Sequence, residues 1–166
     1  MCIRDRLGIT PIAKDLAAAS SFKTADEFFQ LLGDLESRGL SGLFYSYVST
    51  DNKDSSKNIV YLGQGGLSLP DEAYYREDEY QEIRDAFLLH VEKIFELAKL
   101  PNGKAAALQV LALETQIASH HWDQVKDRDA EATYNKKSFT ELASLSPAFN
   151  WPVWISASNT PSHVLE

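Results

Sequence analysis

Apolar residues spaced three and four apart constrain the fold of this chain more than any other feature. Two stretches keep this spacing over several turns: Ile83, Phe87, Val91, Ile94 and Ala98 in the first, and Leu108, Leu111, Thr115, Ala118 and Trp122 in the second. Such spacing places side chains on one face of an α-helix. We therefore expect one long helix from Asp78 to about Leu100, ended by Pro101-Asn102-Gly103, and a second from Lys104 to Trp122. Val110, Leu113 and Ile117 widen the apolar face of the second helix, which favours a central position.

Capping boxes predict where several helices begin. Thr24-Ala25-Asp26-Glu27 precedes an apolar stripe that Gly39 is placed to end, and Asp78-Glu79-Tyr80-Gln81 repeats the same logic. Ser138-Phe139-Thr140-Glu141 opens a short helix that Pro147 follows, and the segment from Trp151 to Ile155 resembles the start of another.

One β element is also expected. The residues from Leu43 to Val48 and from Asn58 to Leu62 are rich in aromatic and β-branched side chains, and a polar stretch from Ser49 to Lys57 separates them. This pattern predicts two short strands in a hairpin. The glycine-rich segment from Gly63 to Pro70 then forms an ordered connector. The predicted fold class is mainly α with a small β-hairpin.

Length and charge exclude several functional classes. The 166 residues suit one domain, and the 18 aromatic residues (3 Trp, 7 Tyr and 8 Phe) are too many for a disordered chain. The formal net charge of −8 gives no field that attracts phosphates, so we expect no nucleic-acid partner. No apolar stretch approaches the roughly 20 residues of a membrane-spanning helix. The single cysteine, Cys2, forms no intramolecular disulfide.

The candidate chemical motifs are weak. His120 and His121 are adjacent on a helix and point about 100° apart, so they cannot both face one metal ion. The glycine-rich run Gly63-Gln64-Gly65-Gly66 lacks the following residues of a phosphate-binding loop, and the acidic run from Asp71 to Glu79 lacks calcium-loop spacing. We therefore predict no catalytic, cofactor-binding or metal-binding residues in this chain.

The segment from Tyr61 to Tyr75, YLGQGGLSLPDEAYY, resembles the hallmark of the N-terminal domain of the neprilysin-like zinc metallopeptidases, family M13. The positions that match are Gln64, Gly65, Gly66, Leu67, Leu69, Pro70, Asp71, Tyr74 and Tyr75. Further matching pieces follow in the family's order, at Arg128, Asp129, Tyr134, Asn135 and Trp151. The resemblance extends from about Leu7 to Ile155.

The resemblance implies that these residues are structural. Gly65 and Gly66 would supply a turn, Pro70 would start a short helix, and the hydroxyls of Tyr74 and Tyr75 would need partners. Arg128 and Asp129 would fix a loop.

The resemblance also implies an activity for a longer protein. Family members combine a helical N-terminal domain, which encloses a chamber, with a zincin domain that carries H-E-x-x-H and hydrolyses peptides with zinc. We expect residues 7–166 to be part of the helical domain, without the catalytic domain and without bound zinc, and residues 1–6 to be a non-native leader. The compartment stays unknown, although the family favours a location outside the cytoplasm. The alternative is a free-standing helical module that binds peptides or proteins without catalysis.

Overall fold

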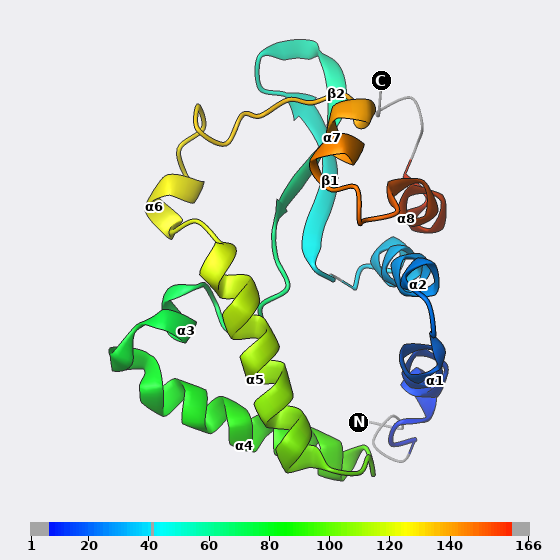
Figure 1. Cartoon of the computed structure of the whole chain (residues 1–166), viewed down its shortest axis with the longest axis vertical. Coiled ribbons are helices and arrows are strands. Elements are labelled where there is room, and N and C mark those ends of the chain that lie inside the picture. Colours follow the sequence, from blue (N-terminus) through cyan, green and yellow to red (C-terminus); the bar gives the residue numbers. More distant parts are fainter. Residues whose placement is uncertain (1–6, 41, 161–166) are drawn as a thin grey trace. The chain divides into compact units, whose positions relative to one another are not determined.

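The computed structural model describes residues 7–40 and 42–160 (Figure 1). The prediction about residues 1–6 lies outside this part. In chain order the elements are η2 (Thr10–Ile12), α1 (Ala13–Ser21), α2 (Ala25–Ser37), β1 (Phe44–Asp51), β2 (Asp54–Gln64), α3 (Ala73–Arg76), η3 (Asp78–Tyr80), α4 (Gln81–Leu97), α5 (Gly103–His120), α6 (Gln124–Asp127), α7 (Phe139–Leu145) and α8 (Trp151–Ser158). The predicted fold class is confirmed, because helices predominate and β1 and β2 form a two-stranded sheet.

The described chain divides into two compact units. Unit 1 contains residues 7–11 and 66–133, and unit 2 contains the remaining described residues, 12–40, 42–65 and 134–160. The boundary at Gly65 and Gly66 falls inside the glycine-rich segment, which therefore contributes to both units.

Unit 1 is built on α4 and α5, which pack against each other through small and β-branched residues. Val91 and Ala98 are buried at the α4 side, and Ala107 and Ala118 are buried on α5. Helix α3 packs against both helices and carries Tyr75, which is also buried.

The predicted capping box at Asp78 is wrong. Residues 78–80 form a turn of 3-10 helix, and α4 begins at Gln81 without a side-chain cap. The chain before α4 is held in another way, because the Arg84 guanidinium donates hydrogen bonds to the carbonyl oxygens of Tyr74 and Glu77 at 2.7 and 2.8 Å. The rings of Tyr74 and Tyr80 stack with centroids 4.2 Å apart.

The second predicted helix is shorter and less buried than expected. Helix α5 ends at His120, so Trp122 lies beyond it. Leu108 and Leu113 are 54% and 57% exposed, which contradicts a central position within the described structure. The buried face of α5 is narrow and is formed by Ala107, Glu114 and Ala118.

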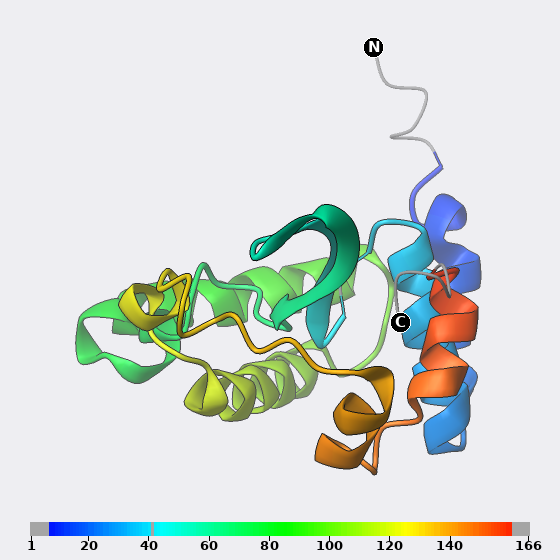
Figure 2. The same ribbon diagram turned by 90° about the horizontal axis from the view of Figure 1, so that it is seen from above.

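Unit 2 is built on α2 and α8, which lie side by side (Figure 1, Figure 2). The helices approach closely at Gly33, where an added Cβ would lie 2.6 Å from the Trp154 carbonyl oxygen and 2.7 Å from the Ala157 Cβ. The predicted capping boxes at Thr24 and Ser138 both form. Gly39 has a φ of +82°, a left-handed conformation suited to glycine, directly after α2 and its cap.

An aromatic cluster fills the space between α2, α8 and the start of β1. Phe149 has ring centroids 4.4 Å from both Phe29 and Trp151, and Phe44 lies 5.2 Å from Trp154. Both tryptophans are buried. The Trp154 indole N–H donates to Glu36 at 3.1 Å, whereas the Trp151 indole N–H has no hydrogen-bond partner among the described residues.

The hairpin strands are longer than predicted. Tyr47 pairs with Tyr61 in antiparallel register, and the pairing continues through the polar residues to Asp51 and Asp54, with an irregularity after Thr50. Backbone hydrogen bonds form a ladder whatever the side chains are, so the polar stretch joins the strands. Only Asn52 and Lys53 remain between the two strands.

Candidate functional site

A buried carboxylate in unit 1 organises the segment that resembles the family hallmark. The Glu114 carboxylate accepts hydrogen bonds from the Ser68 hydroxyl at 2.7 Å, the Ser68 backbone N–H at 3.2 Å and the Tyr75 hydroxyl at 2.6 Å. The Tyr75 oxygen in turn accepts from the Leu69 backbone N–H at 2.9 Å. We call Ser68, Tyr75 and Glu114 the Glu114 cluster. It fixes the glycine-rich segment and α3 to the middle of α5.

Tyr75 is held in its neutral form in this cluster. Burial raises the pKa of its hydroxyl, and the nearby Glu114 carboxylate raises it further. A protonated hydroxyl is the form that donates to a carboxylate. The cluster is therefore arranged as a hydrogen-bond anchor.

Two further contacts tie α3 and its flanks to the end of α5. The Arg76 guanidinium donates to the carbonyl oxygens of Ala118 and of His121, the latter at 2.8 Å. Asp71 accepts from the backbone N–H of Ala73 at 3.0 Å and from the Gln124 side chain. The Arg76 bonds thus tie α3 to the C-terminal end of α5, and the bond from Gln124 ties the segment before α3 to α6.

A second buried carboxylate, Asp51, lies at the end of the hairpin in unit 2. It accepts from the Tyr134 hydroxyl at 2.8 Å, from Lys136 Nζ at 2.6 Å and from the Lys53 backbone N–H at 2.9 Å. The hydrogen bond from Lys136 holds the pKa of the Asp51 carboxyl well below its usual range, and the bonds from Lys53 and Tyr134 act in the same direction. We call Asp51, Tyr134 and Lys136 the Asp51 cluster. It anchors the segment before α7 to the hairpin.

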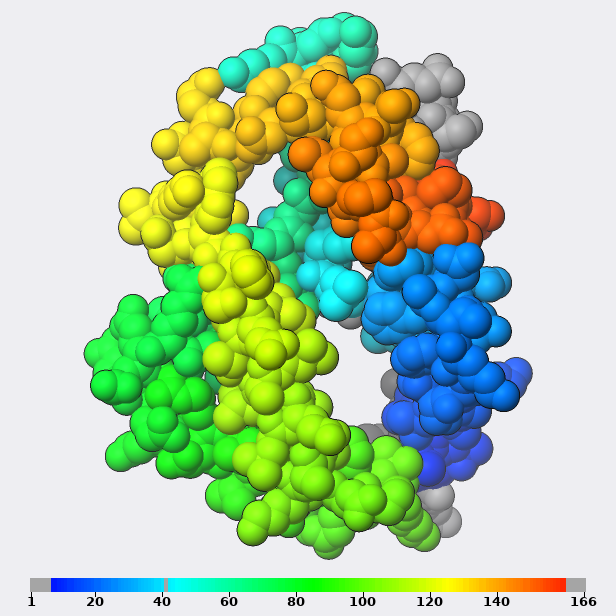
Figure 3. All heavy atoms as spheres, in the orientation of Figure 1, coloured from blue at the N-terminus to red at the C-terminus, as the bar shows by residue number. Residues whose placement is uncertain are grey.

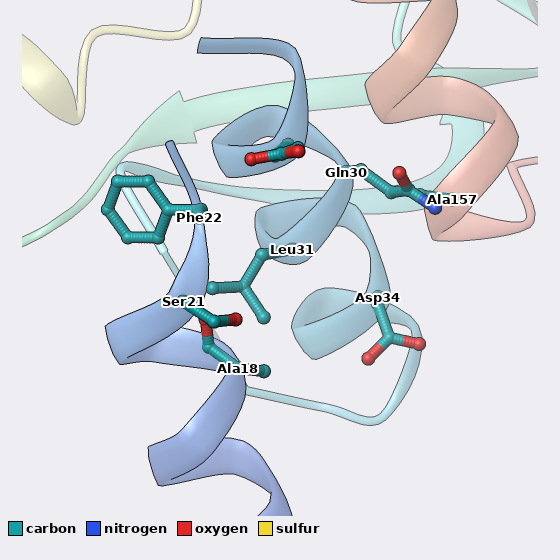
Figure 4. Close-up of a pocket in the computed structure, with 8 residues that line it drawn as sticks. Ala18, Ser21, Phe22, Gln30, Leu31, Asp34 and Ala157 are labelled. Carbon is teal, nitrogen blue, oxygen red and sulfur yellow. The ribbon is translucent and has the colours of Figure 1, made fainter. Parts of the chain in front are cut away.

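A pocket with a volume of about 410 Å³ opens between α1, α2 and α8 (Figure 4). The side chains of Ala18, Phe22 and Leu31 form its apolar side. Its two carboxylates already have partners, because Glu27 caps the start of α2 and Asp34 pairs with Arg38 at 2.8 Å. The pocket therefore shows no group poised for acid-base chemistry.

The described residues do not fit a zinc ion. Glu114 is the acidic residue on the same helix as His120, and its carboxylate already accepts hydrogen bonds from Ser68 and Tyr75. His120 ends α5, and His121 leaves the helix with an extended backbone. Among residues 7–40 and 42–160 no group of three or more His, Cys, Asp or Glu side chains could hold a metal ion.

The structure distributes the predicted motif residues over both units. Gly66 adopts a left-handed φ of +82°, and Gly65 lies against the backbone of Phe44, where an added Cβ would be 3.0 Å from its Cα. Helix α3 begins at Ala73, three residues after Pro70. Most of the other positions lie within or beside an element already described: Gln64 at the end of β2, Leu67 and Leu69 in the connector, Asp71, Tyr74 and Tyr75 around α3, Tyr134 and Asn135 before α7, and Trp151 at the start of α8.

Arg128 and Asp129 stabilise the turn after α6. The Asp129 carboxylate accepts from the backbone N–H groups of Glu131 and Ala132 at 2.9 and 3.1 Å. Arg128 donates to the Gln124 side chain at 3.2 Å. The loop-fixing role that the resemblance implied for these two residues stays a prediction.

Sequence reasoning did not identify Glu114 and Asp51 as the central residues of these clusters. A signal for Glu114 was present, because it is the only acidic residue between Gly103 and His120. Asp51 carried no comparable signal, because it stands in a polar stretch among other turn-forming residues.

Comparison with known proteins identifies the fold and then the family. The crystal structure of the Mycobacterium tuberculosis zinc metalloprotease Zmp1 in complex with an inhibitor superimposes with a TM-score of 0.90 and 34% identity, over 96% of this chain and 25% of that one. A Haemonchus galactose-containing glycoprotein complex, at 21% identity and a TM-score of 0.71, shares the fold. The fold is thus that of the N-terminal part of a zinc metalloprotease.

Sequence relatives agree with this assignment. Endothelin-converting enzyme 1 is 33% identical over 133 residues in Cavia porcellus and over 132 residues in Homo sapiens. Each match covers 76% of this chain and 17% of the relative, so the chain spans about a sixth of their length. The sequence model of peptidase family M13 matches residues 2–165. The chain belongs to peptidase family M13 and corresponds to the N-terminal domain of its neprilysin-like members.

No helix in the described part of the chain combines the length and the apolar character needed to cross a membrane.

Proposed function

We propose that this chain is a scaffold segment of a zinc metalloendopeptidase that hydrolyses peptides. In this proposal residues 7–166 form part of the helical domain that encloses the active-site chamber, and the zinc ligands and general base belong to another part of the protein. The observation that carries the proposal is the match to Zmp1, which covers 96% of this chain but 25% of that enzyme.

The chemistry of the described carboxylates supports a scaffold role. Glu114 and Asp51 each accept three hydrogen bonds, and those from side chains join separate segments of their own unit. Glu36 likewise joins α2 to β1 and α8, because it accepts from the Ser46 hydroxyl at 2.5 Å and from the Trp154 indole. Carboxylates that already accept two or three structural hydrogen bonds have fewer acceptor sites left for a substrate or a metal ion.

The test begins with the gene that carries this segment. We expect its reading frame to encode H-E-x-x-H beyond residue 166, and the complete protein to cleave a quenched peptide in a reaction that a chelator stops. The 166-residue chain assayed alone should not cleave it. A complete reading frame without a metal-binding helix would contradict the proposal.

A Glu114 variant of the complete protein distinguishes a scaffold role from a catalytic role for this segment. Replacing Glu114 with alanine should lower the yield of folded protein, whereas kcat for each folded, zinc-loaded molecule should stay unchanged. A fall in kcat for the folded molecules, with Zn²⁺ content unchanged, would contradict a purely structural role. A location outside the cytoplasm and the absence of a nucleic-acid partner stay predictions.

A further inference from the structure

Helix α5 has an unusual composition for a helix that is open to solvent. Between Gly103 and His120 the sequence contains two formal charges, Lys104 and Glu114. Glu114 is buried in the Glu114 cluster, so Lys104 is the one formally charged side chain on the rest of this 18-residue helix. Solvent-facing helices normally carry a polar face, and a helix that is apolar on most sides belongs inside a larger domain.

The described structure leaves two apolar sides of α5 open. Leu108 is 54% exposed and Leu113 is 57% exposed. They are five positions apart, which places them about 140° apart around the helix axis. Figure 3 shows α5, in yellow-green, running uncovered along the viewed face of unit 1. One neighbour that touched Leu113 could not also cover Leu108.

Helix α4 adds to this open surface. Ile94 and Leu97, near its end, are 48% and 68% exposed. Monomeric proteins rarely leave large apolar patches open, and such patches commonly mark a surface that contacts another polypeptide.

The spacing on α5 indicates the shape of the missing contact. Ala106, Val110, Leu113 and Ile117 follow one another at steps of four, three and four, and uncharged Gln109 and Gln116 flank them. This arrangement suits the side of another helix, because helix packing places ridges of residues three and four apart into the grooves of a partner. The centres of protein contacts are also depleted in charged residues.

We infer that helices from the remainder of the M13 polypeptide pack on α5 at Leu108 and at Leu113, and that α5 is a core helix of the complete domain. The inference rests on the proposed function. The lengths of the relatives indicate which polypeptide would cover α5. The match to Zmp1 leaves three-quarters of that chain outside the aligned region, since it covers 25% of it. That polypeptide is in the same molecule, so its contact with α5 requires no encounter between molecules.

The test compares thiol reactivity in two proteins, the 166-residue chain and the complete protein from the parent gene. Cys2 is first replaced by serine, and any other cysteines of the complete protein are replaced in the same way. Single cysteines are then placed by L108C, L113C and, as a control on the exposed surface of α4, E92C. Each protein is treated with a maleimide reagent under native conditions, and the labelling rate is compared with that of the unfolded protein.

We expect L108C and L113C to react at least about tenfold more slowly in the complete protein than in the 166-residue chain, because a packed thiol reacts only when the structure opens. E92C should react equally fast in both. Equal reactivity of all three cysteines in the complete protein would overturn the inference. So would protection of L113C in the 166-residue chain that grows with protein concentration, because a second copy would then be the occupant.

The readout does not depend on peptidase activity, so the two proposals can fail separately. A complete protein that protects both thiols but cleaves no peptide contradicts the proposed function alone. A chelator-sensitive peptidase in which both thiols stay reactive contradicts this inference alone. A reading frame that ends at residue 166 contradicts both.

Discussion

Each unit of this chain has a buried carboxylate that joins separate segments, Glu114 in unit 1 and Asp51 in unit 2, and the partners of these two carboxylates differ in charge. In unit 1, Glu114 accepts from neutral donors, the Ser68 hydroxyl and backbone and the Tyr75 hydroxyl. In unit 2, Asp51 accepts from the Lys136 ammonium group as well as from Tyr134. Both clusters attach a segment without regular structure to a helix or hairpin.

This difference shows that one structural task can be solved by two kinds of interaction. The Glu114 cluster depends on a protonated tyrosine, and burial, which raises the pKa of Tyr75, keeps it protonated to a higher pH. The Asp51 cluster depends on an ionised carboxyl group, and the hydrogen bond from Lys136, which lowers the pKa of Asp51, keeps it ionised to a lower pH. The two units should therefore respond differently to substitution and to pH.

The largest effect is expected for Glu114→Ala. The substitution leaves the Tyr75 hydroxyl buried without its acceptor and removes both bonds from Ser68, so unit 1 should lose about 2–3 kcal/mol of unfolding free energy. Urea denaturation with hydrogen exchange of α5 peptides measures the loss. Glu114→Gln is the control, and it should cost less because the amide oxygen still accepts. An alanine variant as stable as the original would show that the cluster contributes little.

The next largest effect is expected for Gly33→Ala in unit 2, where backbone contact rather than a carboxylate sets the spacing of α2 and α8. The new methyl group would overlap the Trp154 carbonyl and Ala157, and overpacking of this kind typically costs about 1–3 kcal/mol. Thermal unfolding of the variant tests this. Adding Ala157→Gly should restore part of the loss, and an unchanged midpoint for Gly33→Ala alone would argue against close packing of the two helices.

Asp51→Asn should lower the stability of unit 2 by less than Glu114→Ala lowers that of unit 1. The amide keeps an acceptor oxygen for Tyr134 or Lys136 but removes the negative charge. Lys136→Met is the matched control and should have a smaller effect still, because Lys136 is half-exposed. The variants are compared by their denaturation midpoints, which are measured through hydrogen exchange of the hairpin. The ranking would be reversed if Asp51→Asn proved the most damaging change.

The smallest effect concerns pH, and it acts in opposite directions on the two units. The folded-state pKa of Asp51 lies below that of the unfolded chain, about 4, so its contribution is complete above that pH and is lost as the pH falls further. The folded-state pKa of Tyr75 lies above its unfolded value, about 10, so its contribution is complete below that pH and is lost as the pH rises further.

Hydrogen exchange of each unit is measured across the pH range and corrected for the intrinsic exchange rate. It separates the loss of stability of unit 2 in acid from the loss of stability of unit 1 in alkali. Asp51→Asn should make the stability of unit 2 less dependent on pH in acid, and Tyr75→Phe should make the stability of unit 1 less dependent on pH in alkali. If both variants kept the original pH profile, other groups would be responsible.

The elements predicted correctly are those in which the local sequence pattern and the packing favour the same structure. Thr24 and Ser138 formed capping boxes because the residues that follow them pack as helices. Asp78 had the same spacing but lies itself in a 3-10 turn, which Arg84 and the stacked Tyr80 hold in place. Helix α1 was missed, because its sequence, AKDLAAASS, has a single large apolar residue and no stripe.

The site could be predicted only in part, for a related reason. The motif from Gln64 to Tyr75 was recognisable as a contiguous pattern, but its anchor, Glu114, is 39 positions from Tyr75. Asp51 and Tyr134 are 83 positions apart. Contacts between residues so far apart in the chain produce no periodic pattern in the local sequence. The sequence of α5 predicted a wide buried face, but its buried face in the described structure is narrow, because burial depends on neighbours in space as well as on composition.

The most direct test of the central claim is a zinc assay of the 166-residue chain. The protein is purified, incubated with one equivalent of Zn²⁺ and dialysed, and its metal content is then measured together with its cleavage of a quenched peptide. A scaffold segment predicts no stoichiometric zinc and no cleavage that a chelator abolishes. One tightly bound zinc ion per chain, with chelator-sensitive cleavage that co-purifies with the protein, would contradict the account.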